Sequence, residues 1–230
     1  MPTDAVDDAC ECVLCAELAG NMDTDFHNRT SHGIPSRILI ARNGFTIVPD
    51  IAPIVAGHLL IATTAHRTAM SMLDERMLQD LDGTMSLTAS VLTNAYQTPT
   101  IFYEHGPVDE FERGGCCVDH AHMHALPVAV DVTQSLRTLY DEFRVRRLVE
   151  LQQFARQHLP YLFFQRADGE RLAYAPVRAV SQVIRRLICL ELRLPDRSDW
   201  ESTVDVPKIE ETLATLKLRF EAAAVDHASR

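Results

Sequence analysis

The segment His120-Ala121-His122-Met123-His124 constrains this chain more than any other part of its sequence. In a β-strand, successive side chains point to opposite faces, so the three histidines share one face. In a helix, residues two apart point about 200° apart, which would scatter the imidazoles. The alternation therefore predicts a strand with a row of imidazoles on one face and a buried reverse side of small and apolar residues.

Three imidazoles on one strand face are rarely structural filler, because each buried ring needs hydrogen-bond partners. Two chemistries use such a row. One is a metal site with three histidine ligands. The other is a nucleophilic histidine between histidines that orient a phosphate and donate protons. A solvated or metal-scavenging cluster is the third reading, and spacing alone leaves all three open.

Composition narrows the class of protein. The 230 residues are 47% hydrophobic and 23% charged, which is ordinary globular usage and excludes a disordered or collagen-like chain. A net charge of −10 argues against nucleic-acid binding through the overall field, although a local phosphate site is compatible with it. The sequence has no apolar run long enough to cross a bilayer, and its acidic start lacks the pattern of a secretory signal. These features predict a cytoplasmic protein with no membrane partner and reduced cysteines.

The order of predicted elements indicates an α+β fold. Strands are expected at 38–41 and 45–48 around the hairpin signal Asn43-Gly44, at 57–63 and at 100–105, with a long helix over about 70–96. Beyond residue 130, helices are expected in 134–157, over 180–194 and from Pro207. A second hairpin is expected around Asp168-Gly169. Strands therefore dominate the first part of the chain and helices the end.

Residues 120–126 match every position of the pattern His-φ-His-φ-His-φ-φ, in which φ is apolar. This resembles the histidine triad motif of the HIT superfamily of nucleotide hydrolases and transferases. The run Gly57-His58-Leu59-Leu60-Ile61, followed by His66, resembles a strand and histidine of the same family, and Cys12-x-x-Cys15 resembles its zinc-binding branch. The resemblance spans residues 12 to about 130. It implies an N-terminal zinc-binding segment (1–36), a HIT core with an antiparallel sheet and a long helix (37–130), and a mostly helical extension packed on the core (131–230).

The resemblance also implies roles for the histidines. His122 is the expected nucleophile, which forms a covalent nucleotidyl-histidine, and its other ring nitrogen needs an acceptor such as a backbone carbonyl. His124 and His58 are the further expected catalytic residues, placed to support the phosphate or the leaving group. Gly115 and Cys117 are expected to bind the phosphate, with Cys117 where a hydroxyl is frequent in the family.

A structural zinc ion is the cofactor that the resemblance implies. Its ligands are expected to be Cys12, Cys15, His66 and His120, a closed Cys₂His₂ set that would fix the N-terminal segment to the sheet. A nitrogen bound to zinc cannot attack phosphorus, so His122 must stay free of metal.

Four further residues invite interpretation. His105 is either an additional substrate-binding residue or a histidine at a strand end. Arg147 lies on an apolar helical stripe, so it is either an ion-paired residue or a clamp for phosphate or carboxylate. Arg185 falls off the stripe of its helix, which predicts a solvated side chain, and Trp200 is expected at a helix junction.

The leading hypothesis is a hydrolase that cleaves a nucleoside monophosphate from a leaving group. The alternatives are a nucleotidyltransferase or phosphorylase with the same intermediate, a nucleotide-binding module without turnover, and a metalloenzyme with all three triad histidines on one metal. The resemblance also implies a homodimer that pairs through the long helix and the adjacent strand.

Overall fold

The computed structural model describes residues 12–107, 120–175 and 182–228. Its centre is one sheet of eight strands in the order β1-β2-β3-β5-β4-β7-β8-β6, and every neighbouring pair is antiparallel. The strands are β1 (Ile40–Arg42), β2 (Phe45–Pro49), β3 (Leu59–Thr63), β4 (Thr100–Gly106), β5 (His122–Pro127), β6 (Asp141–Arg144), β7 (Tyr161–Gln165) and β8 (Arg171–Ala175).

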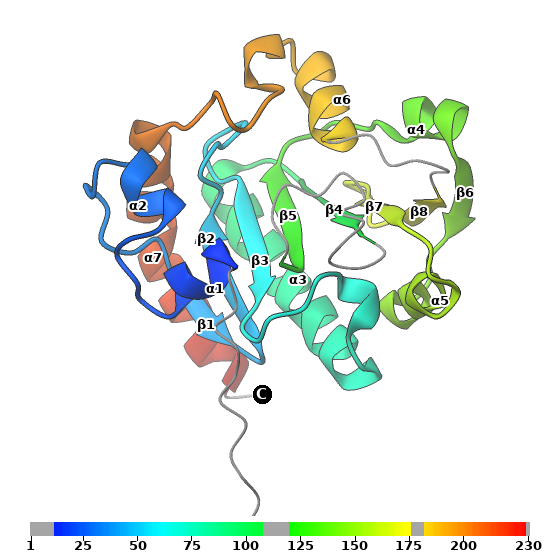
Figure 1. Cartoon of the computed structure of the whole chain (residues 1–230), viewed down its shortest axis with the longest axis horizontal. Coiled ribbons are helices and arrows are strands. Elements are labelled where there is room, and N and C mark those ends of the chain that lie inside the picture. The colour runs from blue at the N-terminus through cyan, green and yellow to red at the C-terminus, as the bar shows by residue number, and fades with distance from the viewer. Residues whose placement is uncertain (1–11, 108–119, 176–181, 229–230) are drawn as a thin grey trace, which may run out of the picture.

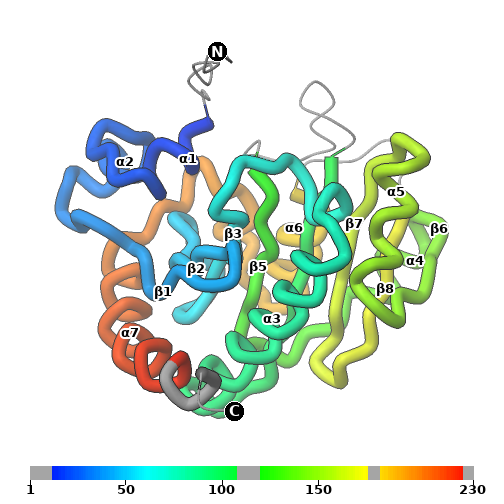
Figure 2. Tube along the Cα trace, turned by 90° about the horizontal axis from the view of Figure 1, so that it is seen from below, coloured from blue at the N-terminus to red at the C-terminus, as the bar shows by residue number. Residues whose placement is uncertain are grey.

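Helices cover both faces of this sheet (Figures 1 and 2). The α-helices are α1 (Val13–Leu18), α2 (Asp25–Arg29), α3 (Glu75–Tyr96), α4 (Thr133–Leu139), α5 (Gln152–Gln157), α6 (Val183–Glu191) and α7 (Val206–Ala228). Three short 3-10 helices are η1 (Met70–Met72), η2 (Leu148–Leu151) and η3 (Pro195–Arg197). No helix among the described residues has the length and apolar character that a membrane span requires.

The two faces of the sheet carry separate apolar cores. On one face, α3, α5 and α7 pack on residues that include Ile61, Phe102 and Met123, and Figure 2 shows these helices side by side. On the other face, α4 and α6 pack on residues that include Ile101 and Leu126. The predicted alternation of β5 is therefore confirmed, because Met123 is buried under α3 while His122 and His124 face the opposite side.

The hairpin between β1 and β2 forms as its turn residues predict. Asn43 and Gly44 have φ values of 50° and 80°, and Arg42 pairs with Phe45 across this two-residue turn. Positive φ at both positions matches the right-handed twist of the flanking strands, and Asn and Gly adopt it at low cost. The predicted long helix is also confirmed as α3, with the Asp74 carboxylate capping Met77 N at 2.8 Å.

The prediction of a continuous helix within 134–157 is wrong. The chain instead forms α4, the edge strand β6, η2 and α5. Phe143 lies opposite Ala173 of β8, so pairing with the sheet replaces a continuous helix there. Leu139 and Phe143, which the expected helix would have placed on its apolar face, are exposed.

The hairpin expected around Asp168-Gly169 is present as β7 and β8, and it extends the sheet. β7 pairs with β4, so Tyr103 lies opposite Phe164 on one side and opposite His124 of β5 on the other. The sheet is therefore continuous across residue 130. β4, the strand that follows α3, has no free edge, and α3 itself packs against α7 and η2. The edge of the strand expected to pair two copies of the chain is thus occupied by β7 within one chain.

Candidate active site and metal centre

The triad strand lies at the floor of a cavity of about 370 Å³. Its walls come from the N-terminal helices and the residues that follow them, the loop between β2 and β3, the central strands β3, β4 and β5, and the C-terminal residues near α6. The residues that line it include Leu14, Phe26, Arg29, Arg37, Asp50, Tyr103, His105, His122, His124, Gln182, Arg185 and Trp200. Parts of the chain that are far apart in sequence therefore share one site.

His122 has the tautomer that a nucleophile requires. Its Nδ1 lies 2.6 Å from the carbonyl oxygen of His120, so Nδ1–H donates this bond and Nε2 keeps its lone pair. Burial lowers the pKa of His122 below its ordinary value, although the bond to the His120 carbonyl acts in the opposite direction. The ring is therefore a neutral imidazole in the cavity wall, and the backbone-carbonyl acceptor expected from the sequence is present.

His124 and His58 form a hydrogen-bonded pair next to a buried carboxylate. The Ile54 amide donates to His58 Nδ1 at 3.2 Å, which leaves the proton of the neutral ring on Nε2. This Nε2 lies 3.0 Å from His124 Nδ1, and the Asp50 carboxylate is 3.5 Å from each of the two nitrogens. Because His124 Nδ1 accepts this hydrogen bond, the neutral His124 ring carries its own proton on Nε2. The Tyr103 ring stacks on His124 at a centroid distance of 4.2 Å and fixes its plane.

Burial sets the charges of this group. It lowers the pKa of His58 to about 4 and that of His124 to about 3, so both rings are neutral at pH 7. Burial by itself raises the pKa of a carboxyl, but His58, the bond to His124 and Arg185 hold the pKa of Asp50 well below its usual range. The group thus combines an ionised carboxylate with two neutral imidazoles.

Asp50, His58 and His124 also lie close enough together to hold a cation. The tautomer of His58 argues against that use. Because His58 Nδ1 accepts from a backbone amide, Nε2 would have to give up the only ring proton to bind a metal. The arrangement therefore suits a hydrogen-bond network better than a metal site.

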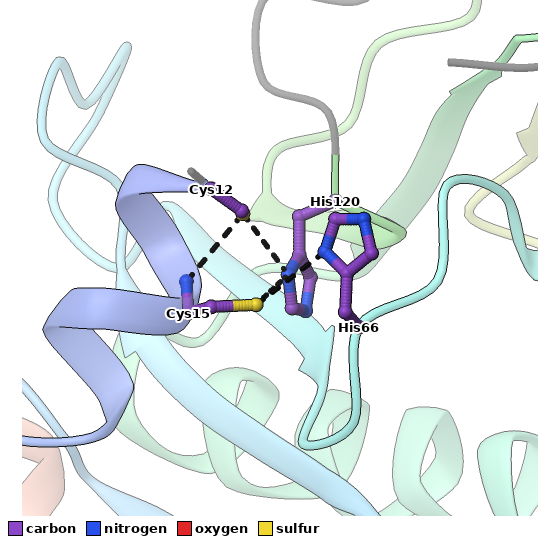
Figure 3. A group of neighbouring side chains, drawn as sticks. All are labelled: Cys12, Cys15, His66 and His120. Carbon is purple, nitrogen blue, oxygen red and sulfur yellow. Dashed lines mark hydrogen bonds between the residues drawn. The ribbon is translucent and has the colours of Figure 1, made fainter. Parts of the chain in front are cut away.

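A second cluster brings together Cys12, Cys15, His66 and His120 (Figure 3). His120 Nδ1 lies 3.5 Å from Cys12 Sγ and 3.4 Å from Cys15 Sγ, and His66 Nδ1 lies 3.4 Å from Cys15 Sγ. Ligands of tetrahedral zinc, with bonds of about 2.3 Å to sulfur and 2.0–2.1 Å to nitrogen, lie about 3.6 Å apart. The spacing of the four side chains therefore fits a zinc ion.

The second nitrogen of His120 supports the same conclusion. Nε2–H donates to the Thr63 carbonyl at 2.6 Å, which turns the Nδ1 lone pair toward both sulfur atoms. Such a bond to a carbonyl orients a metal-binding histidine. His120 thus faces the cysteines while His122 binds a carbonyl and lines the cavity, so the triad imidazoles do not converge on one metal.

Four sequence-predicted substrate residues have different positions. His105 on β4 lines the cavity and is buried, and its Nε2 has no hydrogen-bond partner among the described residues. Gly115 and Cys117 lie outside the described residues. The prediction that Arg147 binds substrate is wrong. Its side chain is 71% exposed, lies 3.8 Å from Glu75 and does not line the cavity. The physical reason is that residues 141–144 form a strand, so no helix places Arg147 on an apolar face.

Sequence reasoning missed several residues of the site. Asp50 directly follows β2, and an acid at a buried strand end eight residues before His58 was a usable signal. Arg37 is buried, binds Glu17 through Nε at 2.6 Å and Nη2 at 2.8 Å, and lies over the Phe26 ring. Arg185 is also buried, contrary to the expected solvated position. Trp200 lines the cavity, with the Arg29 guanidinium 5.3 Å from its ring centroid.

Three solved structures illustrate which proteins the chain is similar to. A HIT-like protein of Bartonella henselae involved in cell-cycle regulation is 19% identical, with 60% of this chain and 98% of that chain covered and a TM-score of 0.36. A zinc-bound histidine triad protein of Mycobacterium smegmatis is 17% identical, with 64% and 92% covered and a TM-score of 0.40. Yeast Ap4A phosphorylase in complex with AMP is 12% identical, with 83% and 79% covered and a TM-score of 0.43. A search of curated proteins finds no match.

An antiparallel sheet with a long helix on one face and a row of histidines on the other defines a histidine triad protein. Residues 31–129 match the family model of the HIT domain, so this part of the chain, which holds the triad strand, is a HIT domain.

Proposed function

We propose that this protein is a nucleotide hydrolase that releases a nucleoside monophosphate from a conjugate through a covalent intermediate on His122. The observation that carries this proposal is the bond of 2.6 Å between His122 Nδ1 and the His120 carbonyl. It leaves Nε2 as an unprotonated nucleophile in the wall of a cavity large enough for a small ligand.

The reaction has two displacements at phosphorus. In the first, the Nε2 lone pair forms a P–N bond, and the bond from phosphorus to the leaving group breaks. The leaving group takes that electron pair and a proton from solvent. In the second, water forms a P–O bond, the P–N electron pair returns to Nε2, and the extra proton of the water leaves to solvent. A neutral imidazole is regenerated, and one water molecule is consumed per bond cleaved.

The neighbouring residues have proposed roles in stabilising charge. His124 donates a hydrogen bond from Nε2 to a phosphoryl oxygen or to the leaving group, while His58 holds its tautomer and Asp50 lies beside the pair. His105 contributes a further polar contact to the substrate, and Gly115 and Cys117 remain proposed phosphate contacts. Preorganised donors of this kind act where negative charge develops in the transition state.

We further propose that Cys12, Cys15, His66 and His120 hold a structural zinc ion. The spacing of the four side chains and the orientation of His120 support this assignment. When bound, zinc would supply a cross-link between α1 and the start of the triad strand. A cytoplasmic location remains a proposal from the thiol chemistry.

The test uses p-nitrophenyl esters of the four common nucleoside 5′-monophosphates. The expected result is release of p-nitrophenol and an acid-labile nucleotidyl adduct on His122. The variant His122→Asn should lose the adduct and at least about a thousandfold of the rate, because the nucleophile is gone. It should keep nucleoside monophosphate binding within about threefold, as measured by calorimetry.

His158→Asn is the matched control, because His158 is exposed and its left-handed backbone suits Asn. Full activity in His122→Asn would contradict the proposal. Monophosphate binding without turnover in the wild type would favour a binding module. Product formation only with added phosphate would favour a phosphorylase.

A further inference from the structure

The loop of residues 50–58 joins β2 to β3 and carries a functional residue at each end, Asp50 and His58. Its bonds to itself include the Ala52 amide to Asp50 Oδ1 at 2.7 Å and the Ile54 amide to His58 Nδ1 at 3.2 Å. The backbone of this loop therefore orients both the carboxylate and the imidazole. A shift of the loop would move the partners of His124.

The carbonyls at the centre of this loop are bonded from the C-terminal part of the chain. Ala52 and Pro53 are buried, and a buried carbonyl without a donor costs free energy. Three hydrogen bonds from one segment reach these carbonyls: Asp205 N to Ile51 O (3.4 Å), Arg185 Nη2 to Ala52 O (2.7 Å) and Arg197 Nη1 to Pro53 O (2.9 Å).

A fourth contact fixes the far end of the loop. Gly57 N donates to Thr212 Oγ1 of α7 at 3.0 Å, while the Thr212 hydroxyl donates to the Lys208 carbonyl at 2.7 Å. Gly57 has φ of +80°, and a Cβ there would come within 2.4 Å of the Tyr96 ring. The far end of the loop thus fits closely against the end of α3 and is bonded to α7.

The donors are themselves linked, with Arg185 at the centre. Its Nε donates to the Arg197 carbonyl at 2.9 Å, and Arg197 pairs with Asp205 at 2.7 Å. Arg185 is 3% exposed, lines the cavity, and forms no ion pair within 4 Å among the described residues. A buried guanidinium bonded only to neutral oxygens is costly, so its place in the wall of the cavity that Asp50 also lines indicates a function.

We propose that residues 185–212 set the geometry of the Asp50–His58–His124 network, and that Arg185 is the positioning residue through which they act. This inference deepens the proposed function and rests on it, because positioning matters for the step at His122. Arg185 donates to two backbone carbonyls, those of Ala52 and Arg197, and to the Thr203 hydroxyl, and a single amine in its place cannot reproduce these three bonds.

The experiment compares Arg185→Met with Arg186→Met, which changes an exposed arginine on the same helix. The first measurement is the ¹⁵N signature of the His58 and His124 rings by NMR, which reports tautomer and hydrogen bonding without turnover. The second is the rate of adduct formation with the p-nitrophenyl nucleotide esters, alongside the affinity for nucleoside monophosphates.

Arg185→Met is expected to shift the imidazole signals and to slow adduct formation by about tenfold or more, with affinity changed by less than about threefold. Arg186→Met should leave all three unchanged. Arg185→Lys, which keeps the charge, should recover only part of the rate. If Arg185→Met does not fold, Thr212→Val replaces it, because this near-isosteric change removes the acceptor of Gly57.

A folded variant with wild-type imidazole signals and rate would overturn the inference. A wild type that forms no His122 adduct would instead remove the proposed function. The imidazole comparison would then still decide whether Arg185 positions the network, so the two failures are distinguishable.

Discussion

At the scale of single residues, Glu104 is a carboxyl enclosed by apolar core. It accepts hydrogen bonds from the Met70 amide at 2.8 Å and from the Tyr161 hydroxyl at 2.6 Å. Burial raises the pKa of Glu104 from 4.5 to about 7, since the two hydrogen bonds only partly offset the loss of solvation. Tyr161, whose pKa burial raises well above its usual value, is the titratable group that Glu104 contacts among the described residues.

This raised pKa predicts a pH-dependent stability. The folded state binds the Glu104 proton more tightly than the unfolded state, so the contribution is complete below about pH 4.5 and is lost as pH rises through about 7. Glu104→Gln should remove this loss, which amounts to about 3 kcal/mol in free energy of unfolding. Urea unfolding at pH 5 and pH 8 measures it, with exposed Glu201→Gln as the control. An unchanged pH dependence in Glu104→Gln would show that another group is responsible.

At the scale of elements, α1 is a helix of six residues. A helix this short is not stable by itself, so its position depends on tertiary contacts. Cys12 caps it and Cys15 lies in its first turn, and both sulfur atoms face His120 at the start of β5. The metal centre is therefore the proposed anchor between the N-terminal segment and the triad strand.

Loss of a zinc ligand should consequently release metal and lower stability. His66→Asn is expected to hold less than half of the zinc of the wild type and to melt at least about 5 °C lower, because metal binding contributes to folding free energy. Atomic absorption and calorimetry measure the two quantities. His32→Asn, at an exposed position, is the control. Equal zinc content in both variants would refute the Cys₂His₂ assignment.

At the scale of the whole molecule, the C-terminal part of the chain completes the sheet that the HIT domain begins. β7 occupies the edge of β4, and α7 packs on α3, β1 and β2. In the described part of the chain, the remaining edges of the sheet are β1 and β6. Both are short, and β6 presents Asp141, Glu142 and Arg144. Short strands and charged side chains discourage pairing between copies at a sheet edge.

The full chain is therefore expected to be a monomer of 25.8 kDa, in contrast to the dimer that the family resemblance implies. Light scattering coupled to size-exclusion chromatography, over a hundredfold range of protein concentration, measures the mass. A mass of two chains that persists on dilution would show that the molecule pairs through a different surface.

Local patterns accounted for much of the site. The alternation of β5, the Asn43-Gly44 turn and the length of α3 follow from side-chain periodicity and backbone preference, which act over a few residues. The four metal-binding candidates were also predicted, through the motif that they share with the family, and the structure places them together. The helix expected in 134–157 failed because pairing of Phe143 with Ala173 outweighs a local stripe.

The sequence by itself thus determined the triad strand and the class of fold, and it predicted the role that we propose for His122. Only the tertiary structure decided that Asp50 contacts His58 and His124, that Arg185 is buried against Ala52, and that β7 closes the edge of β4. Periodicity reports which face of its own element a residue occupies. It does not report which distant segment covers that face, because that depends on how the whole chain buries its carbonyls, charges and apolar surface together.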